Sequence, residues 1–266
     1  MSDAWRRTEP SDLAALEAAG LLAAWEHHEI LASTNDRALK YCACGIGRTP
    51  LLVFANAQTA GRGRGQNAWL SEPGALTFSL VLSDRDVGLS ADRLPRLSLL
   101  TAIAVAEALE ELEPRYDFLL KWPNDVFVEG RKVAGILLER STAAVNLTVV
   151  GVGVNVNNPL GSGPPSIRET AIALCDLGGR RRALADALAA ILRRLQDTLR
   201  RGADADGLVT RWRPRCLLAD RWVAVAGSDR RIEGRCRGID DRGALVIETA
   251  NGAVSVNTGT IERYEP

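Results

Sequence analysis

The chain has 266 residues, enough for one large domain or for a domain of about 200 residues followed by a small module. Lysine plus arginine and aspartate plus glutamate each number 33, so the net charge is zero, which excludes a broad, sequence-independent grip on nucleic acid or on an acidic membrane. No apolar run approaches the roughly 18 residues of a membrane-spanning helix, and the N-terminal stretch lacks the apolar segment of a signal peptide, so we expect a cytoplasmic protein.

The first part of the chain is predicted to alternate between helices and strands. In order, the sequence predicts helices at 10–25 and 33–45, strands at 51–56 and 75–82, and a long amphipathic helix at 90–113. The second helix has Ser33 or Thr34 as its N-cap and Gly45 at its end. Pro95 is compatible with the long helix because it falls in the first turn, where no intrahelical N–H bond is lost.

Strands dominate the middle of the chain. In order, the sequence predicts strands within 118–140, a strand at 146–157, a loop at 159–165 and helices at 167–213. A tight turn at Glu129 and Gly130 joins the first of these strands. The helix predicted within 178–201 has a basic face, which is typical of a solvated surface.

The last part of the chain is predicted to contain strands alone. Four short segments bounded by Gly or Asp turns have strand character: 221–227, 231–240, 243–249 and 253–257. Such a run of short strands is typical of a small barrel. We therefore predict an α+β protein with two domains, 1–214 and 215–266.

The cysteines give no sign of a disulfide framework or a metal site. The sequence contains five of them: Cys42, Cys44, Cys175, Cys216 and Cys236. None forms a C-x-x-C pair, and the two histidines of the chain are adjacent at positions 27 and 28. An odd, dispersed set of this kind favours reduced thiols.

Residues 58–71, QTAGRGRGQNAWLS, place two arginines between three glycines. A Walker loop is excluded because residues 66–67 are Gln-Asn where that loop has Gly-Lys, and a dinucleotide-binding turn is excluded because Pro73 breaks the helix it needs. The glycines let the backbone approach a ligand closely, and Arg62 and Arg64 can bind carboxylate or phosphate bidentately. We interpret this segment as a flexible anion clamp. A solvated surface loop is the alternative if the segment is taken alone.

Four further motifs accompany this one along the chain. The five are, in order, STN at 33–35, QTAGRGRGQNAW at 58–69, KWPND at 121–125, GRKVAGILLE at 130–139 and VVGVGVNVNN at 149–158. Together they closely resemble biotin protein ligases, the enzymes that adenylate biotin and pass it to a lysine of a carboxylase carrier domain. The resemblance covers nearly the whole chain, since residues 164–174 and 238–247 are similar to that family's later helices and its SH3-like C-terminal barrel.

The sequence departs from many bacterial members of that family at one place. Those members have G-R-G-R-R-G-R-x-W, whereas this chain has Gly65, Gln66 and Asn67 after Arg64 and so resembles a G-R-G-R-G-x-N-x-W variant. The spacing to Trp69 is unchanged, so we expect the loop to keep its role. The resemblance implies a mixed-sheet catalytic domain of the biotin/lipoate ligase type followed by a small SH3-like β-barrel.

The chemistry that the resemblance implies agrees with the residue types. Joining a carboxylate to the α-phosphate of ATP brings two anions together, so the site needs cations, and Arg62, Arg64 and Lys132 can supply them. The resemblance implies a catalytic role for these three residues and for Asp125. Asp125 has two alternative roles, as a ligand of Mg²⁺ or as a group that helps to deprotonate the acceptor lysine.

The resemblance also implies which residues hold the substrates. Biotin contacts are implied for Ser33, Thr34, Asn35, Gln58, Arg62, Gly63, Arg64 and Lys132. Nucleotide contacts are implied for Trp69, Asn124, Asp125 and Asn155. Short polar side chains suit the ureido ring of biotin, an aromatic ring suits adenine, and Asn124 with Asp125 offers hard oxygen ligands for Mg²⁺. Taken singly, Trp69 fits a core position, Asn124 with Asp125 a turn, and Lys132 an exposed strand.

The expected function is that of an ATP-dependent ligase, with ATP and Mg²⁺, that forms biotinyl-5'-AMP and transfers biotin to a specific lysine of a biotin carboxyl carrier domain. Only 32 residues precede Ser33, too few for the winged helix-turn-helix of larger members, so we expect the short form without an N-terminal DNA-binding domain and without a nucleic-acid or membrane partner. The carboxylase that is modified, and whether the protein forms a homodimer, are left open.

Two alternatives compete with this function. A lipoate or octanoate ligase or transferase shares a related fold, but its pocket must hold an acyl chain, and the Gly-Arg loop followed by KWPND is not expected there. A nucleic-acid-binding module would also use a Gly-Arg loop and a small barrel. Zero net charge and the lack of interleaved aromatic residues in the loop argue against it.

Overall fold

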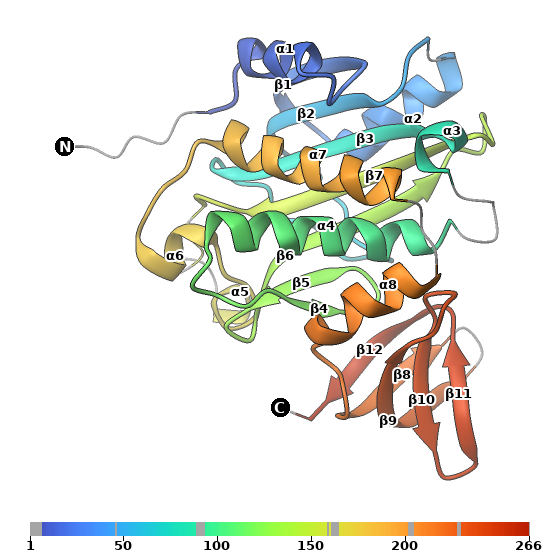
Figure 1. Ribbon diagram of the computed structural model, residues 1–266. Coiled ribbons are helices and arrows are strands. Elements are labelled where there is room, and N and C mark those ends of the chain that lie inside the picture. Colours follow the sequence, from blue (N-terminus) through green and yellow to red (C-terminus); the bar gives the residue numbers. More distant parts are fainter. Residues whose placement is uncertain are drawn as a thin grey trace.

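The computed structural model describes residues 7–45, 47–88, 94–158, 160, 165–201, 205–227 and 230–265. Within them the chain forms a seven-stranded sheet covered by helices and a five-stranded C-terminal sheet (Figure 1). The helices are α1 (Pro10–Ala18), α2 (Thr34–Cys44), α3 (Asp84–Val87), α4 (Arg96–Leu112), α5 (Pro165–Thr170), α6 (Leu174–Gly178), α7 (Leu184–Arg200) and α8 (Ala205–Trp212), with the 3₁₀ turn η3 (Arg213–Arg215). The strands are β1 (Ala24–Leu31), β2 (Leu51–Gln58), β3 (Ala75–Ser83), β4 (Leu119–Lys121), β5 (Asp125–Val128), β6 (Arg131–Arg140), β7 (Leu147–Asn155), β8 (Trp222–Gly227), β9 (Arg231–Ile239), β10 (Leu245–Thr249), β11 (Gly252–Val256) and β12 (Gly259–Tyr264).

The large sheet is mixed, as the sequence predicts. Its order is β1-β2-β3-β7-β6-β5-β4, in which β1 and β2 run parallel and the other neighbours run antiparallel. The longest ladder joins β3 to β7, from Ala75 opposite Asn155 to Ser83 opposite Leu147. Both strands are buried along almost their whole length because they lie in the middle of the sheet, between two covered faces.

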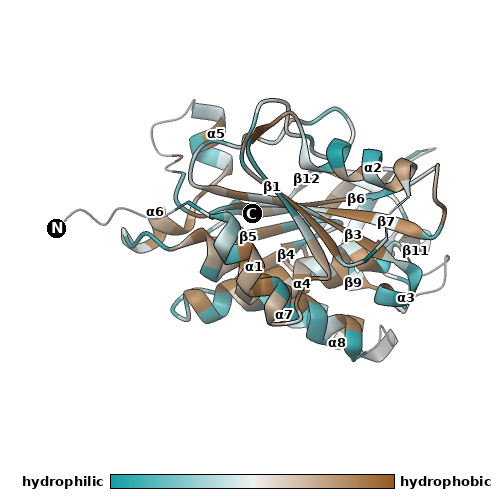
Figure 2. Cartoon of the chain, turned by 90° about the horizontal axis from the view of Figure 1, so that it is seen from above, coloured by the Kyte–Doolittle hydropathy of each residue, from teal (hydrophilic) through white to brown (hydrophobic). Residues whose placement is uncertain are grey.

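The two faces of this sheet are covered differently. α4 and α7 pack against one face and against each other, while α2 lies on the opposite face, as the view from above shows (Figure 2). Alternate residues of β7, Val150, Val152 and Val154, belong to the main apolar core. The residues between them, Gly151 and Gly153, point to the α2 side because side chains alternate along a strand. Their lack of a side chain leaves space on that face.

The caps and turns confirm several predictions. Ser33 is the N-cap of α2, where its Oγ accepts a hydrogen bond from the backbone N of Asp36 at 3.3 Å, and Gly45 ends the helix with φ +83°. Glu129 and Gly130 form the turn between β5 and β6 with φ values of 50° and 71°. Positive φ at both central residues is what a two-residue hairpin turn requires.

The later helices are confirmed with altered bounds. The predicted helix at 90–113 is observed as α4, which begins at Arg96. Its predicted first residues, 90–93, lie outside the described residues, and so does most of the predicted loop at 159–165. The predicted helical region at 167–213 is divided among α5, α6, α7 and α8. None of the described helices is long and apolar enough to cross a membrane.

The first predicted helix was too long, and it concealed a strand. α1 ends at Ala18, and Gly20, with φ +72°, turns the chain toward β1. Trp25, the last residue of the predicted helix, lies in β1 opposite Leu52 of β2. The apolar residues at 21–25 continue the helical spacing, but tertiary pairing with β2 overrides this local preference.

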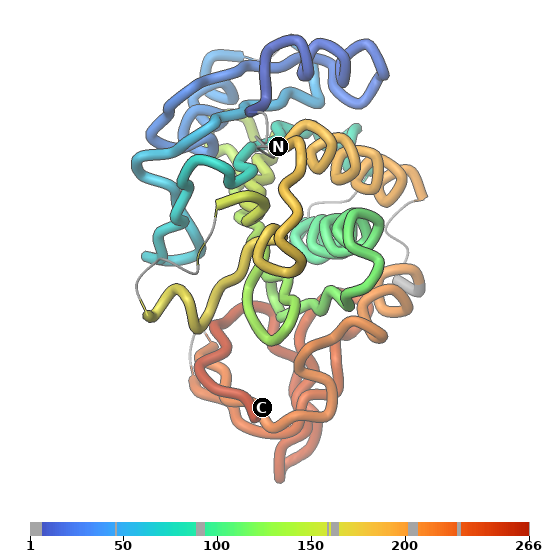
Figure 3. The backbone as a smooth tube through the Cα atoms, turned by 90° about the vertical axis from the view of Figure 1, so that its left-hand side faces the viewer, coloured from blue at the N-terminus to red at the C-terminus, as the bar shows by residue number. Residues whose placement is uncertain are grey.

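The C-terminal sheet is antiparallel, with the order β11-β10-β9-β8-β12. The predicted SH3-like barrel is seen as this five-stranded sheet, which has one strand, β12, beyond the four predicted. Figure 3 shows the sheet at the end of the molecule opposite α1 and β1. Its buried residues Val223, Leu245 and Ile247 belong to the same apolar core as the large sheet. The domain boundary at residue 214 stays a prediction.

Candidate active site

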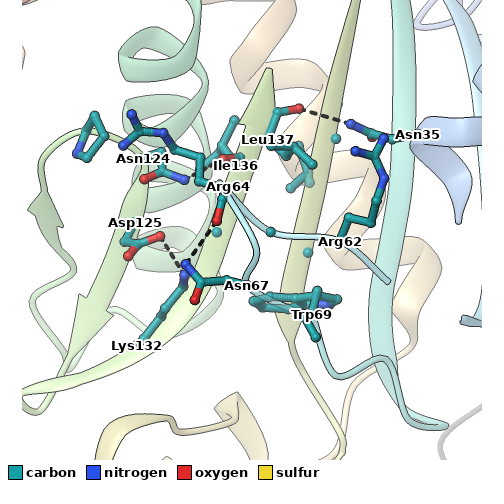
Figure 4. A pocket seen from close by; sticks show the side chains of 18 of the residues that line it. Asn35, Arg62, Arg64, Asn67, Trp69, Asn124, Asp125, Lys132, Ile136 and Leu137 are labelled. Atoms are coloured by element: carbon teal, nitrogen blue, oxygen red, sulfur yellow. Dashed lines mark hydrogen bonds and ion pairs between the residues drawn. The ribbon is translucent and has the colours of Figure 1, made fainter. Parts of the chain in front are cut away.

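A cavity of about 610 Å³ opens on the α2 side of the large sheet (Figure 4). Its walls come from the start of α2, the Gly-Arg loop, strands β5, β6 and β7 of the large sheet, and β12 of the C-terminal sheet. Every residue that the sequence predicts for the site lines this cavity except Asn155. Asn155 is 4% exposed at the end of β7, and its Oδ1 accepts a hydrogen bond from Nδ2 of Asn158 at 3.0 Å. Its position does not support direct contact with a nucleotide in this cavity.

The two glycines of β7 form part of the cavity floor. A Cβ atom added to Gly151 would overlap the side-chain amide of Asn35, and one added to Gly153 would overlap the indole of Trp69. Both side chains therefore lie directly on the strand, where glycine alone leaves room for them. The alternation in VVGVGVN thus has a physical cause, with valine toward the core and glycine toward the cavity.

The end of the cavity next to α2 is a buried hydrogen-bond network, called here the α2 end. The backbone N and Oγ1 of Thr34 both donate to Oε1 of Gln58, at 2.7 and 3.1 Å. Oγ of Ser79 lies 2.8 Å from Oγ1 of Thr34 and 2.5 Å from Oδ1 of Asn35. These bonds fix the side chains without a ligand. The sequence analysis missed Ser79, although a polar residue between apolar neighbours of β3 was a usable signal.

Arg62 is held by two carboxylates. Its Nη2 lies 2.6 Å from Oε2 of Glu139 and 2.7 Å from Oδ1 of Asp36, and Nδ2 of Asn35 donates to the same Glu139 oxygen at 2.7 Å. The hydrogen bond to Glu139 is the main cause of the raised pKa of Arg62. The loop arginine is therefore oriented by acidic partners that the sequence analysis did not identify.

Arg64 reaches in a different direction, to the C-terminal sheet. Its Nη1 donates to the backbone oxygen of Gly259 at 2.9 Å, and its Nη2 lies 3.5 Å from Oγ1 of Thr258. Burial lowers the pKa of Arg64. Thr260 and Ile261 of β12 line the cavity close to this contact. The C-terminal sheet is thus one wall of the site, a contribution that the sequence did not predict.

The Gly-Arg loop is folded by its own hydrogen bonds. The backbone N of Gly63 donates to the oxygen of Asn67 at 2.7 Å, and Nδ2 of Asn67 donates to the oxygen of Arg64 at 2.9 Å. Gly65 has φ +64°, a conformation that favours glycine. The variant Gly-Gln-Asn sequence therefore builds a turn that points Arg62 and Arg64 to opposite sides.

Two lysines lie at the other end of the cavity, called here the lysine end. Nζ of Lys132 is 2.6 Å from Oδ1 of Asp125 and 5.8 Å from the ring centroid of Trp69 (Figure 4). Nζ of Lys121 lies 4.8 Å from the ring centroid of Tyr264 in β12. Burial lowers the pKa of Lys121, and Asp125 opposes that effect. Lys121 belongs to the KWPND motif, but no role for it was predicted from the sequence.

Asn124 and Asp125 differ in how free their oxygens are. Nδ2 of Asn124 donates to the backbone oxygen of Ile136 at 2.6 Å, a bond that does not use its side-chain oxygen. Asp125 is the one carboxylate among the described residues that line the cavity, and one of its oxygens pairs with Lys132. Within the described residues, no group of three or more His, Cys, Asp or Glu side chains could hold a metal without other ligands.

The cavity lies on one face of a mixed sheet, with the Gly-Arg loop and a small C-terminal sheet as walls. Residues 28–157 match the Biotin/lipoate A/B protein ligase family, and residues 220–264 match the Biotin protein ligase C terminal domain. The chain belongs to this family and, within it, to the biotin protein ligases.

Individual relatives agree with this assignment. The Biotin--[acetyl-CoA-carboxylase] ligase of Mycobacterium tuberculosis is 31% identical over 272 residues, which covers 98% of both chains. The Bifunctional ligase/repressor BirA of Bacillus subtilis is 30% identical over 89% of this chain and 73% of its own length. Among solved structures, the biotin protein ligase from Aquifex aeolicus in complex with biotin and ATP superposes with a TM-score of 0.78 at 28% identity, over 90% of this chain and 97% of that one.

Proposed function

We propose that this chain uses ATP to convert biotin into biotinyl-5'-AMP and then transfers the biotinyl group to a lysine of a carboxylase carrier domain. The observation that carries the proposal is one cavity that joins an uncharged hydrogen-bond network to two lysines. Such a cavity suits a ligand with a polar, neutral head and a carboxylate that meets a nucleotide. The relatives named for biotin, and the Aquifex complex with biotin and ATP, support the same substrates.

The reaction has two steps. In the first step, a carboxylate oxygen of biotin attacks the α-phosphorus of ATP, and pyrophosphate leaves. In the second step, the neutral amine of the acceptor lysine attacks the biotinyl carbonyl carbon, the amine loses a proton, and AMP leaves as the amide forms. Fixed cations lower the barrier of the first step because they are already in place when negative charge gathers on the phosphate.

The α2 end of the cavity suits the ureido ring of biotin. Ser33, Thr34, Asn35 and Gln58 are oriented there with Ser79, and both donors and acceptors are present. A biotin bound in this way extends its acyl chain along the cavity, past Asn35 and Trp69, toward Lys132. Because the network is formed without the ligand, binding loses little side-chain entropy at this end.

The lysine end of the cavity suits the nucleotide. Lys132 and Lys121 provide charge for the carboxylate and the α-phosphate, and the indole of Trp69 provides a flat surface for adenine. Nε1 of Trp69 is buried against Gly153 of β7 and has no hydrogen-bond partner among the described residues. Arg64 donates to neutral oxygens of the C-terminal sheet, which leaves its charge available for phosphate more readily than that of Arg62.

Mg²⁺ fits the residues present in part. A magnesium ion usually takes one or two protein carboxylates and completes its shell with phosphate oxygens and water. Asp125, whose second oxygen is not used by Lys132, and the side-chain oxygen of Asn124 would hold it beside the phosphates of ATP. The ion would supply further neutralising charge for pyrophosphate. The alternative role of Asp125, accepting a proton from the acceptor amine, requires the same free oxygen.

Net charge and the exposed edge of the large sheet bear on the partners and the location of the protein. Zero net charge supports a protein that does not bind nucleic acid, and it is compatible with the cytoplasm. The edge strand β1, on which Ile30 is 67% exposed, is compatible with a homodimer. The carboxylase carrier is the protein partner that the function requires.

One experiment tests the function directly. A biotin carboxyl carrier domain is incubated with the protein, biotin and Mg-ATP, and its intact mass is measured. We expect one added biotinyl group on one lysine, and none when biotin or ATP is omitted. Biotin-dependent exchange between ATP and pyrophosphate should accompany it. Modification with lipoate in place of biotin, or no exchange with either acid, would overturn the proposal.

A further inference from the structure

Two carboxylates outside the lining of the large cavity contact residues that belong to it. Glu139 lies in β6, two residues beyond Leu137 of the cavity wall, and Asp36 lies in the first turn of α2. Both side chains are partly exposed. The proposed function gives neither carboxylate a role.

One oxygen of Glu139 accepts hydrogen bonds from two segments of the chain. Its Oε2 lies 2.7 Å from Nδ2 of Asn35 and 2.6 Å from Nη2 of Arg62. Asn35 belongs to the first turn of α2, whereas Arg62 belongs to the Gly-Arg loop. This single atom therefore joins the α2 end of the cavity to the loop.

The shared oxygen fixes which way the amide of Asn35 faces. Nδ2 of this buried residue also donates to the backbone oxygen of Leu137 at 3.3 Å, and its Oδ1 lies 2.5 Å from Oγ of Ser79. A reversed amide would place Oδ1 against the carboxylate of Glu139, where two acceptors repel each other. Because Asn35 lines the cavity, Glu139 sets the orientation of a side chain that a ligand meets.

The same oxygen holds Arg62 together with Asp36. Nη2 of Arg62 is 2.6 Å from Oε2 of Glu139 and 2.7 Å from Oδ1 of Asp36. Two carboxylates outnumber the one guanidinium, so the cluster as a whole does not attract a further anion. In this arrangement the charge of Arg62 attaches the Gly-Arg loop to β6 and α2.

The two carboxylates are not equivalent. Among the described residues, the carboxylate of Asp36 contacts Arg62 and not Asn35, although Asn35 is its neighbour in the sequence. Asp36 therefore supports the loop alone, whereas Glu139 supports the loop and the amide of Asn35. This difference provides a matched pair of positions for a test.

We propose that Glu139 is a positioning residue for biotin activation, an inference that rests on the proposed function. It orients the amide of Asn35 in the cavity, and it anchors the Gly-Arg loop through Arg62. Recognition of the biotin head group and attachment of the loop thus depend on the same oxygen. Glu139 acts through these two residues, because it lies outside the cavity lining.

The loop anchor is tested first, without ligands. Wild-type protein, Glu139→Gln and Asp36→Asn are digested briefly with trypsin, and cleavage after Arg64 is measured relative to cleavage after the exposed Arg242. Each variant leaves Arg62 with one carboxylate, so cleavage after Arg64 should be about two- to fivefold faster than in the wild-type protein, the factor for one exposed ion pair. An unchanged rate for Glu139→Gln would overturn the anchoring role.

Biotin affinity separates the role of Glu139 from that of Asp36. Calorimetry with biotin is carried out in an Arg62→Ala background, where the loop has lost its anchor and the contact between Glu139 and Asn35 remains. There, Glu139→Gln should weaken biotin binding about fivefold, the factor between a hydrogen bond to a charged group and one to a neutral group. Asp36→Asn should leave the biotin Kd of that background unchanged. In the same background, Glu139→Gln should raise the KM for biotin and not the KM for ATP, because ATP is assigned to the lysine end.

The outcomes distinguish this inference from the proposed function. Equal biotin affinity with and without Glu139→Gln in the Arg62→Ala background, or an equal loss with Asp36→Asn, would overturn the role of Glu139 in orienting Asn35. Failure of the wild-type protein to bind biotin would instead contradict the proposed function. The digestion needs no ligand, so it decides the loop anchor in either case.

Discussion

The two ends of the large cavity are built in opposite ways. At the α2 end, the neutral side chains of Thr34, Asn35 and Ser79 are buried, and they are hydrogen-bonded to one another and to the partly buried Gln58. At the lysine end, the walls are a glycine-rich loop and the last strand of a second sheet, joined through Arg64 by two hydrogen bonds. One end is set by the core of the large sheet, and the other depends on how separate segments meet.

This difference indicates that an adenylating enzyme can use one part of its site to recognise the substrate and another part to close over it. A rigid network can select one small head group at little entropic cost. A loop and a wall that meet through few bonds can open for ATP and then exclude water from the mixed anhydride. Substitutions at each end, and digestion of the Gly-Arg loop, test this difference.

The largest effect is expected for Lys132→Met at the lysine end. The ammonium group of Lys132 is held 2.6 Å from Asp125, so its charge is in position before the reaction begins. Its loss should slow adenylate formation by roughly a hundredfold or more, the scale for one preorganised charge contact. Single-turnover formation of biotinyl-5'-AMP measures this directly. Arg131→Met, on the adjacent residue of β6 outside the cavity lining, is the matched control. A normal rate for Lys132→Met would remove it from the reaction.

Gly151→Ala tests whether the α2 end is as rigid as the contrast requires. The added methyl group would overlap Asn35, which the surrounding hydrogen bonds hold in place. Overpacking of this kind costs about 1–3 kcal/mol, so biotin should bind roughly 5- to 150-fold more weakly by calorimetry.

Val150→Ala provides the control for that variant. Val150 neighbours Gly151 but belongs to the apolar core on the other face of β7. Its truncation should lower the melting temperature and leave the biotin Kd unchanged. If Gly151→Ala binds biotin as well as the wild-type protein, the α2 end adapts and is not preformed.

Limited digestion with trypsin tests whether the Gly-Arg loop is mobile without ligands. Arg62 and Arg64 are cleavage sites in a loop with three glycines, which we expect to open in the absence of ligand because few apolar contacts hold it. Biotin with Mg-ATP at about ten times their Kd should slow cleavage there by about tenfold. Cleavage after Arg242, in the exposed turn before β10, serves as the internal reference. Equal rates with and without ligands would favour the solvated-loop alternative.

The smallest effect is expected from the pH dependence of stability. Burial lowers the pKa of Lys121 below its usual 10.5. Between the lowered value and the usual one, the unfolded chain binds more protons than the folded chain, so the free energy of unfolding should rise with pH in that alkaline window. Lys121→Met should reduce this rise in urea titrations, whereas Lys40→Met, at an exposed position of α2, should not. Parallel curves for wild type and Lys121→Met would contradict the assigned burial.

The sequence predicted the elements whose signals are local. Ser33 and Gly45 mark the ends of α2, and Glu129 with Gly130 marks the β5–β6 turn, because capping and turn geometry are decided by a few neighbouring residues. β1 and β12 were missed for the opposite reason. Both are partly exposed strands whose pairing with β2 and β8 comes from distant parts of the chain.

In the site, too, residues within motifs were predicted, whereas contacts between distant parts of the chain were not. Motif resemblance brought Arg62, Trp69 and Lys132 to one cavity, although their individual roles stay predictions. The resemblance did not predict the carboxylates that hold Arg62. Glu139 is 77 residues away from Arg62 and pairs with it only in the folded chain. The nucleotide role predicted for Asn155 rested on its motif alone and stays a prediction, since Asn155 lies outside the cavity lining and is bonded to Asn158.

The position of β12 at the end of the chain affects how the site forms during translation. Translation runs from the N-terminus at about 5–20 residues per second, and N-terminal parts fold first. The α2 end is complete once β7 has been made, because Gly151 lies against Asn35, but the wall needs Thr260 and Ile261 from the last strand of the chain. A nascent chain still attached to the ribosome near its C-terminus would therefore hold biotin before it could shelter an adenylate.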